Sequence, residues 1–350
     1  MAGAETVRKP FEIAGHSIAA GERALVDLPM PRLSSRTSLN MPVHVIHGRR
    51  DGPTLFISAA LHGDELNGVE IIRRILKTRA LRRLRGTLIA VPVVNAYGLI
   101  HESRYLPDRR DLNRSFPGSD QGSLAARLAN LFLEEVVSRC SHGIDLHTGA
   151  IHRPNLPQIR ADLDDEETLQ LARAFGVPVL LNASLRDGSL RGAAGELGIP
   201  TLLYEAGEAL RFDEVSIRAG VAGALNVMRK LEMLPPSKRK ADTRREPVVS
   251  RRSGWVRAPE SGMLSTVLPL GAKVTKDETL GYIDDPYSGE REPVVSNADG
   301  IIIGRLELPL VHEGDAIFHI ARFETDAGDV AEQVGHFNAD HAEDQDPAED

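Results

Sequence analysis

The apolar residues of the chain change their spacing several times, and each change predicts a different element. Five short, largely apolar runs are typical of strands buried on both faces of a sheet. These runs lie at 54–60, 87–94, 143–147, 177–181 and 201–205. Apolar residues recur at helical spacing at 65–77, 124–137, 166–175 and 213–231. This alternation predicts an α/β domain in which helices flank a mainly parallel or mixed sheet.

Different patterns flank that domain. Residues 8–48 alternate short apolar and polar stretches, which predicts an antiparallel hairpin at the entry to the sheet. The polar, basic and proline-bounded stretch that follows the last helix is typical of a solvated linker. Beyond it, short apolar runs alternate with glycine turns, which predicts a small all-β domain. We therefore expect four parts, at 1–234, 235–252, 253–325 and 326–350.

The all-β part resembles the barrel-sandwich fold of biotinyl and lipoyl domains. Residues 256–262 and 294–300 look like its two related half-motifs. A swinging-arm domain carries its cofactor on a lysine at the hairpin between the halves, but residues 284–292 contain no lysine. The pattern therefore argues against a cofactor carrier, and it leaves a lid, an oligomerisation or a gating role open.

The charge of the chain is concentrated at its end. The net charge is −8, but residues 326–350 hold nine acidic residues and no lysine or arginine, so the remainder has a net charge of +1. We expect this tail to be disordered and solvated, and we expect no nucleic-acid partner for the nearly neutral body. No apolar run approaches the roughly 18 residues of a membrane helix. With no signal-peptide pattern and one cysteine, Cys140, we expect a cytoplasmic protein without disulfides, which could form a homo-oligomer.

Polar residues stand at the ends of three predicted strands, where sites form in open α/β sheets. His62 and Glu65 lie three residues apart at a strand-to-helix junction, and His147 ends another strand. Imidazole and carboxylate ligands suit zinc, and three protein ligands leave a fourth position open, as catalytic sites do. Asp145, on the same strand face, could orient His147. As alternatives, Glu65 could serve only the helix start and His147 could be a core histidine.

A third strand end carries Glu205, whose carboxylate could act as general acid and base or form a structural ion pair. The loop after residue 95 is rich in charge. In it, Arg104 could stabilise an oxyanion, and Asn113 with Arg114 could bind a carboxylate. Asp111 could orient these arginines. The same loop could also be an ordinary solvated surface.

Taken together, the motifs HGDE (62–65), RY (104–105), DLNRSFPG (111–118), DLHTG (145–149) and YEAGE (204–208) resemble one family. This is the succinylglutamate desuccinylase and aspartoacylase family of the zinc carboxypeptidase superfamily, in its deacylase-like bacterial branch. The resemblance covers about residues 40–325. It implies a zinc carboxypeptidase-like fold and zinc-dependent hydrolysis of a linear amide. It further implies these roles: His62, Glu65 and His147 as ligands of one Zn²⁺ per chain, Glu205 as general acid and base, Arg104 at the oxyanion, and Asn113 and Arg114 at the substrate carboxylate.

The sequence departs from the aspartoacylase pattern near the substrate. The insert between Arg104 and Asp111 is longer than expected, and the family's further carboxylate-binding arginine has no clear counterpart before Glu205. Three functions are therefore compared. The first is deacylation of an N-acyl amino acid or a related small carboxylate. The alternatives are a metallocarboxypeptidase acting on a short peptide and a non-catalytic binding protein, which an intact Glu205 and Arg104 disfavour.

Overall fold

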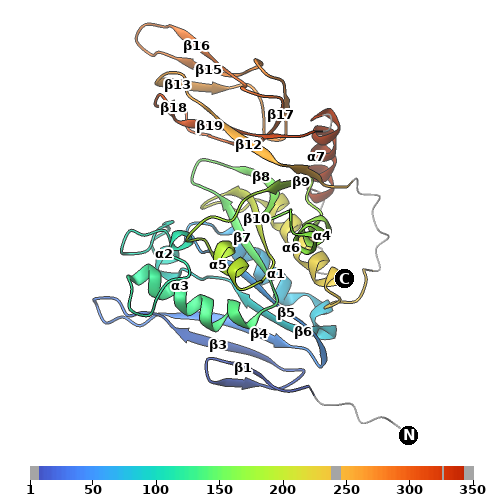
Figure 1. Ribbon diagram of the computed structural model, residues 1–350. Helices are drawn as coiled ribbons and strands as arrows, with labels where there is room; N and C mark the ends of the chain where they lie inside the picture. Colours follow the sequence, from blue (N-terminus) through green and yellow to red (C-terminus); the bar gives the residue numbers. More distant parts are fainter. Residues whose placement is uncertain (1–7, 238–245, 325–326, 343–350) are drawn as a thin grey trace.

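The computed structural model describes residues 8–237, 246–324 and 327–342. One mixed sheet extends through nearly the whole molecule, from the amino-terminal strands to the carboxy-terminal β region (Figure 1). Its main path runs β12-β19-β17-β8-β10-β7-β5-β6-β4-β3, with β9, β11 and β14 attached at its side. A separate hairpin, β1 (Phe11–Ile13) and β2 (His16–Ile18), lies beside β3.

The centre of the sheet is parallel, and its flanks are antiparallel. The four parallel strands are β6 (Arg85–Val91), β5 (Arg50–Ala59), β7 (His142–Gly149) and β10 (Thr201–Glu208). On one side, β4 (Asn40–His47) and β3 (Arg23–Pro29) continue the sheet antiparallel, as the hairpin pattern predicts. On the other side, β8 (Asn155–Ala161) runs antiparallel to β10 and parallel to β9 (Val179–Asn182).

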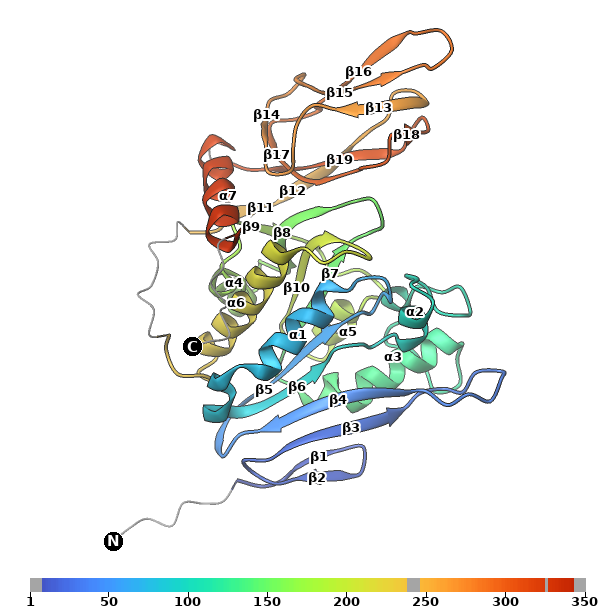
Figure 2. The ribbon, with the colours of Figure 1, turned by 180° about the vertical axis from the view of Figure 1, so that it is seen from behind.

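Helices cover both faces of this centre. Figure 2 shows the face on which three long helices pack together: α1 (Asn67–Lys77), α4 (Glu166–Phe175) and α6 (Glu214–Lys230). The opposite face carries α2 (Ala96–Ile100), α3 (Leu124–Glu135) and α5 (Leu190–Glu196). Three short 3₁₀ turns complete the set, at Arg79–Arg83, Leu112–Arg114 and Val137–Arg139.

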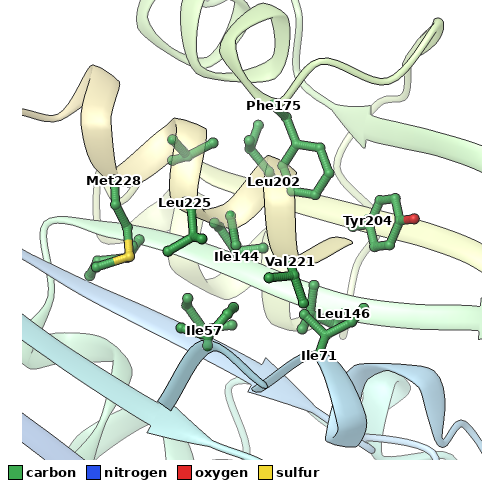
Figure 3. Packing of buried hydrophobic residues seen from close by; sticks show 14 of the residues in the cluster. Ile57, Ile71, Ile144, Leu146, Phe175, Leu202, Tyr204, Val221, Leu225 and Met228 are labelled. Carbon is green, nitrogen blue, oxygen red and sulfur yellow. The ribbon is translucent and has the colours of Figure 1, made fainter. Parts of the chain in front are cut away.

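The apolar core between α1, α4, α6 and the sheet fixes the position of the strands that carry the polar tips. Figure 3 shows Ile57, Ile144 and Leu202 from three neighbouring strands meeting side chains of the helices. All three are fully or almost fully buried. Each such side chain contributes roughly 1.5–3 kcal/mol by leaving water. The second core, on the face of α3 and α5, packs against β5, β6, β4 and β3 from the other side.

The carboxy-terminal region is a pair of packed antiparallel sheets. One layer continues the main sheet through β12 (Arg252–Arg257), β19 (Ala316–Arg322), β17 (Gly300–Arg305) and β14 (Lys273–Val274). The other consists of β16 (Arg291–Val295), β15 (Thr279–Asp284), β13 (Gly262–Thr266) and β18 (Leu310–Val311). Apolar side chains of the two layers form a core of their own.

Two expectations for the connecting and terminal segments are wrong in part. Within the expected linker 235–252, β11 (Val248–Ser250) pairs in parallel with β9, while residues 238–245 lie outside the described residues. Within the tail, residues 327–342 form helix α7 instead of disordered chain. Residues 326 and 343–350 lie outside the described part.

Helix α7 (Ala327–Ala342) forms because its few apolar residues share one face. Val330, Val334, Phe337 and His341 are spaced by four, three and four residues, and all are buried. Acidic residues such as Glu332 and Asp340 lie between them. The expectation of disorder rested on the acidic composition of this segment. The helical spacing of its buried residues outweighs that composition, and the segment packs as a helix.

The predicted fold class is confirmed: a mixed sheet flanked by helices, followed by an antiparallel β region. Within the described residues, no helix is both long enough and apolar enough to span a membrane.

Candidate active site

The three predicted strand ends meet at one edge of the sheet. β5, β7 and β10 are neighbouring parallel strands, so their carboxyl ends lie side by side. Glu205 and His147 are direct partners in the β10–β7 ladder, which places their side chains next to each other on the same face. Asp145 pairs in the same way with Ser58 of β5. The register of the sheet therefore assembles the site.

The loop that carries His62 is held by the strand end of β6. Ala60 adopts a left-handed conformation, with φ of 48°, which turns the chain sharply after β5. The backbone amide of Asn95 donates to the carbonyl of Ala60 at 2.9 Å, and its side-chain amide donates to that of Leu61 at 3.2 Å. Asn95 also caps α2 by accepting from Gly98. Asn95 thus holds the loop that carries His62.

His62, Glu65 and His147 form a compact, buried group of potential metal ligands. One donor atom from each lies within 4.8 Å of the others. Nδ1 of His62 lies 2.6 Å from Oε1 of Glu65, and Nδ1 of His147 lies 2.7 Å from Oε2. All three side chains are less than 6% exposed. The two imidazoles therefore point their Nδ1 atoms at one carboxylate from two sides.

A second row of carboxylates fixes both imidazole rings. Nε2 of His147 donates to Asp145 at 2.7 Å, and Nε2 of His62 donates to Asp111 at 3.0 Å. Such bonds hold a proton on Nε2 and fix each ring so that Nδ1 is the nitrogen a metal would take. A His₂Glu donor set with both rings held from behind fits Zn²⁺. The predicted role of Asp145 agrees with this geometry, and Asp111 contacts a ligand as well as an arginine.

Opposing charges dominate the electrostatics of this group. Burial by itself raises the pKa of Glu65, but the adjacent His62 and His147 outweigh it and hold the pKa far below its usual range. Burial lowers the pKa of His147, but Asp145 and Glu65 overcompensate and raise it well above its ordinary value. The pKa of each group in this cluster therefore depends on the charges of its neighbours.

Arg104 joins this group from the charged loop. Two of its nitrogens bind Oδ2 of Asp111, at 3.2 and 3.0 Å, and Nη1 lies 3.3 Å from Oε1 of Glu65. Burial lowers the pKa of Arg104, but Glu65 and Asp111 raise it overall, so the side chain stays cationic. A fixed cation therefore stands beside the potential ligands, as the sequence predicts.

Asn113 and Arg114 both reach the same cleft. The side-chain oxygen of Asn113 accepts from the backbone amide of Leu190 at 2.9 Å, which ties the loop to α5. Arg114 donates to the carbonyl of Asn113 at 2.6 Å and is otherwise exposed to the cleft. The structure therefore places the predicted pair beside the other site residues, although part of Asn113 serves the fold.

Glu205 is held on both carboxylate oxygens by residues of β8. Nδ2 of Asn155 donates to Oε1 at 2.5 Å, and Nε of Arg160 lies 2.6 Å from Oε2. The sequence pattern singles out neither Asn155 nor Arg160 as a partner of Glu205. The antiparallel β10–β8 register brings both to Glu205. No sequence signal connects residues so far apart in the chain.

The cleft that contains these residues has a volume of about 980 Å³ and is rich in arginine. Several of its arginines have no carboxylate within ion-pair distance among the described residues. They are Arg114, Arg153, Arg186, Arg191, Arg252 and Arg322. Burial and the nearby Arg160 lower the pKa of Arg191 to about 10. This excess of positive charge favours an anionic ligand.

The carboxy-terminal β region supplies one wall of the cleft. Trp255 of β12 and His319 of β19 are paired in register and stack with ring centroids 4.6 Å apart. Burial, followed by the charge of Arg160, lowers the pKa of His319 to about 3, so its imidazole is neutral near pH 7. Gly304 leaves space between His319 and Asn155, because a Cβ there would lie 2.6 Å from Oδ1 of Asn155. No pattern in the sequence indicates this wall.

Comparison with known proteins identifies the family. Residues 51–231, just over half of the chain, match the succinylglutamate desuccinylase/aspartoacylase catalytic domain. The chain belongs to this family. The match includes every predicted site residue, from His62 to Glu205, and it confirms the family resemblance of the sequence motifs. The protein is accordingly a member of a family of deacylating hydrolases.

Individual relatives cover most of the chain. An N-alpha-acetyl-L-2,4-diaminobutyric acid deacetylase from Halomonas elongata is 27% identical over 298 residues, which are 80% of this chain and 85% of the relative. A succinylglutamate desuccinylase/aspartoacylase from Rhodobacter sphaeroides is 24% identical with a TM-score of 0.77, over 87% of this chain and 96% of that one. A product-bound ectoine utilization protein from Ruegeria pomeroyi is 24% identical with a TM-score of 0.75, over 85% and 94%. At this identity the two structures support the fold.

Proposed function

We propose that the protein is a zinc-dependent amidohydrolase that removes the acyl group from an N-acyl amino acid or a related small carboxylate. One Zn²⁺ per chain would be held by His62, Glu65 and His147. The observation that carries the proposal is the approach of these three donors to within 4.8 Å, with both imidazoles fixed from behind. The family of the chain supports a deacylase.

When bound, Zn²⁺ would supply Lewis-acid chemistry, polarising the scissile carbonyl and making a water more acidic. Glu205, beside His147 in the ladder, takes the proton of the attacking water and passes it to the nitrogen of the leaving amine. Arg104, fixed by Asp111, places its cationic charge next to the oxygen of the carbonyl that becomes negative. These residues act at neighbouring strand ends, so the reacting groups need little rearrangement.

The substrate is proposed to carry at least one free carboxylate. Asn113 and Arg114 line the cleft, and the arginine can bind a carboxylate through two parallel hydrogen bonds. The six cleft arginines without a carboxylate partner support the same choice. The relative from Halomonas elongata is named for an N-acetylated amino acid, which suggests an acetyl group as the first acyl group to test.

A metallocarboxypeptidase remains the alternative, because it would use the same catalytic groups on a peptide. It requires a cleft that is open to a long chain. Trp255 and His319 of the carboxy-terminal region wall the cleft here, which favours a small substrate. We therefore rank deacylation first.

A hydrolysis screen tests the proposal. The metal content of the purified chain is measured first, and the zinc-loaded protein is then incubated with N-acetyl and N-succinyl amino acids. Peptides that end in Glu or Asp form the second arm. Release of the amine from an N-acyl amino acid supports deacylation, whereas cleavage of the peptides alone would replace it by carboxypeptidase activity. Hydrolysis of neither class by a zinc-loaded, folded protein would refute the proposed function.

A further inference from the structure

Both oxygens of Glu205 are occupied in the ligand-free protein. Asn155 binds Oε1 at 2.5 Å and Arg160 binds Oε2 at 2.6 Å, and both come from the strand next to Glu205. The two contacts differ in kind. The amide donates a hydrogen bond that orients the carboxylate, whereas Nε of Arg160 forms a close ion pair with Oε2 without the angle of a hydrogen bond, and the guanidinium covers that oxygen. A general base with this arrangement is oriented but not free.

Arg160 lies near Arg191, and the combined positive charge of the two side chains favours a bound anion. Arg191 is partly buried, and its guanidinium donates to the carbonyls of Ala183 and Ser184, at 2.8 and 3.2 Å, with no carboxylate partner among the described residues. Its pKa is lowered to about 10, first by burial and then by the charge of Arg160. The two cations therefore repel each other across the cleft, and an anion between them would relieve that repulsion.

The nearby histidine does not change this balance. His319 lines the same part of the cleft, and burial and Arg160 keep its imidazole neutral. Glu205 is the one carboxylate that contacts Arg160 within the described chain. An incoming carboxylate would thus compete with Glu205 alone for the guanidinium.

We propose that Arg160 is a positioning residue that substrate carboxylate draws away from Glu205, so that only a carboxylate-bearing substrate frees the general base. This inference rests on the proposed function, because it concerns the acid and base of that reaction. The free protein holds Glu205 between Asn155 and Arg160. Bound substrate places its carboxylate beside Arg160 and Arg191, with Arg114 of the same cleft as a further cation for it. Glu205 then keeps Asn155 and can take the proton of the water. The substrate carboxylate therefore affects kcat as well as the affinity for the substrate.

The test compares two matched substrates. The first is the N-acyl amino acid that the zinc-loaded wild type hydrolyses best, and the second is its C-terminal carboxamide, which lacks the charge. In the wild type we expect kcat for the acid to exceed kcat for the carboxamide by at least about tenfold. In Arg160→Gln, the carboxamide should react at least as fast as in the wild type, and the ratio of the two kcat values should fall about tenfold or more.

Further variants keep the inference falsifiable. Arg160→Lys retains the charge but lacks the planar set of guanidinium donors, so its kcat ratio should lie between those of the wild type and Arg160→Gln. If the glutamine variant does not fold, the lysine variant is compared with the wild type instead. Arg291→Gln removes an exposed cation that pairs with Asp284 and does not line the cleft, and it should leave the ratio unchanged.

Three outcomes would overturn the inference. Equal fractional losses of kcat on both substrates would reduce Arg160 to a structural support of Glu205. A higher KM for the acid with unchanged kcat values would make it a simple binding residue. A wild-type kcat ratio near one would remove the need for a gate. By contrast, a wild type that hydrolyses neither substrate refutes the proposed function itself.

Discussion

Asp145 binds the far side of His147, with Oδ2 of the carboxylate 2.7 Å from Nε2 of the imidazole. Its other oxygen accepts a hydrogen bond from Ser58, also at 2.7 Å, so the carboxylate is fixed on both sides. All three residues are buried. This series of hydrogen bonds from β5 to β7 sets which nitrogen of His147 faces Glu65, so the proposed ligand depends on a carboxylate outside the group of three donors.

Replacing Asp145 by asparagine should weaken zinc binding while preserving the shape of the site. The neutral amide is a poorer acceptor for the Nε2 proton of His147, and outer partners of this kind typically contribute about 10–100-fold to metal affinity. Competition with a chromogenic chelator measures the change. Asp164→Asn removes an exposed carboxylate that contacts none of the three potential ligands, and it serves as the matched control. An unchanged affinity would show that Asp145 does not support the ligand.

Gly304→Ala should impair turnover without loss of metal. A Cβ at this position would lie 2.6 Å from Oδ1 of Asn155 and 3.3 Å from Cβ of His319, so Asn155 must move away from Glu205. We expect kcat to fall by at least about tenfold with zinc content unchanged. Gly335→Ala is the control, since nothing lies within 4 Å of its Cβ position. Wild-type turnover in the Gly304 variant would show that the position of Asn155 does not affect the reaction.

Glu70 should stabilise the protein in a pH-dependent way. Its pKa is lowered to about 2, first by the hydrogen bonds of Arg73, and it also binds Arg74. Because the folded pKa lies below the unfolded value, the stabilisation is present above about pH 4.5 and is lost as the pH falls towards 2. Glu70→Gln should cost about 1 kcal/mol at pH 7, after allowance for solvent screening.

Urea unfolding of both proteins at several pH values measures that difference. The gap between wild type and Glu70→Gln should close as the pH falls from 4.5 to about 2. A gap that stays constant across this range would mean that the charge of Glu70 contributes nothing to stability.

Phe337→Ala should destabilise the carboxy-terminal helix. The ring is 8% exposed and lies 4.3 Å from the ring of His341, within the core that α6 shares with the sheet. Removing it should cost about 3 kcal/mol. Limited proteolysis followed by mass spectrometry should then show faster cleavage in 327–342. The same protection as in the wild type would contradict the packing of α7.

The polar strand tips could be predicted from the sequence because each is a local feature. His62, His147 and Glu205 follow short apolar runs, and the carboxyl ends of parallel strands meet at one edge. His62 and Glu65 lie three residues apart at a strand-to-helix junction, and this spacing allows both side chains to face the same position. These residues could therefore be grouped without knowing the packing of the helices.

The partners of Glu205 could not be predicted in this way. Asn155 and Arg160 lie on β8, whose sequence shows neither clear alternation nor a continuous apolar run, and their contacts depend on the antiparallel register with β10. Trp255 and His319 reach the cleft only because the sheet continues into the carboxy-terminal region. Long-range strand pairing decides both features, and single-sequence patterns do not encode it.

In the proposed function, His62, Glu65 and His147 hold one zinc ion for a reaction in which Glu205 moves the proton. Zinc content and turnover of two variants, measured side by side on the best N-acyl amino acid, test it most directly. We expect Glu205→Gln to retain one zinc per chain with kcat reduced by at least about 10²-fold, and His147→Ala to lose both zinc and turnover. His101→Ala, an exposed histidine, should retain both. Wild-type zinc and turnover in His147→Ala would show that His147 does not hold the metal, and full turnover in Glu205→Gln would show that Glu205 does not move the proton.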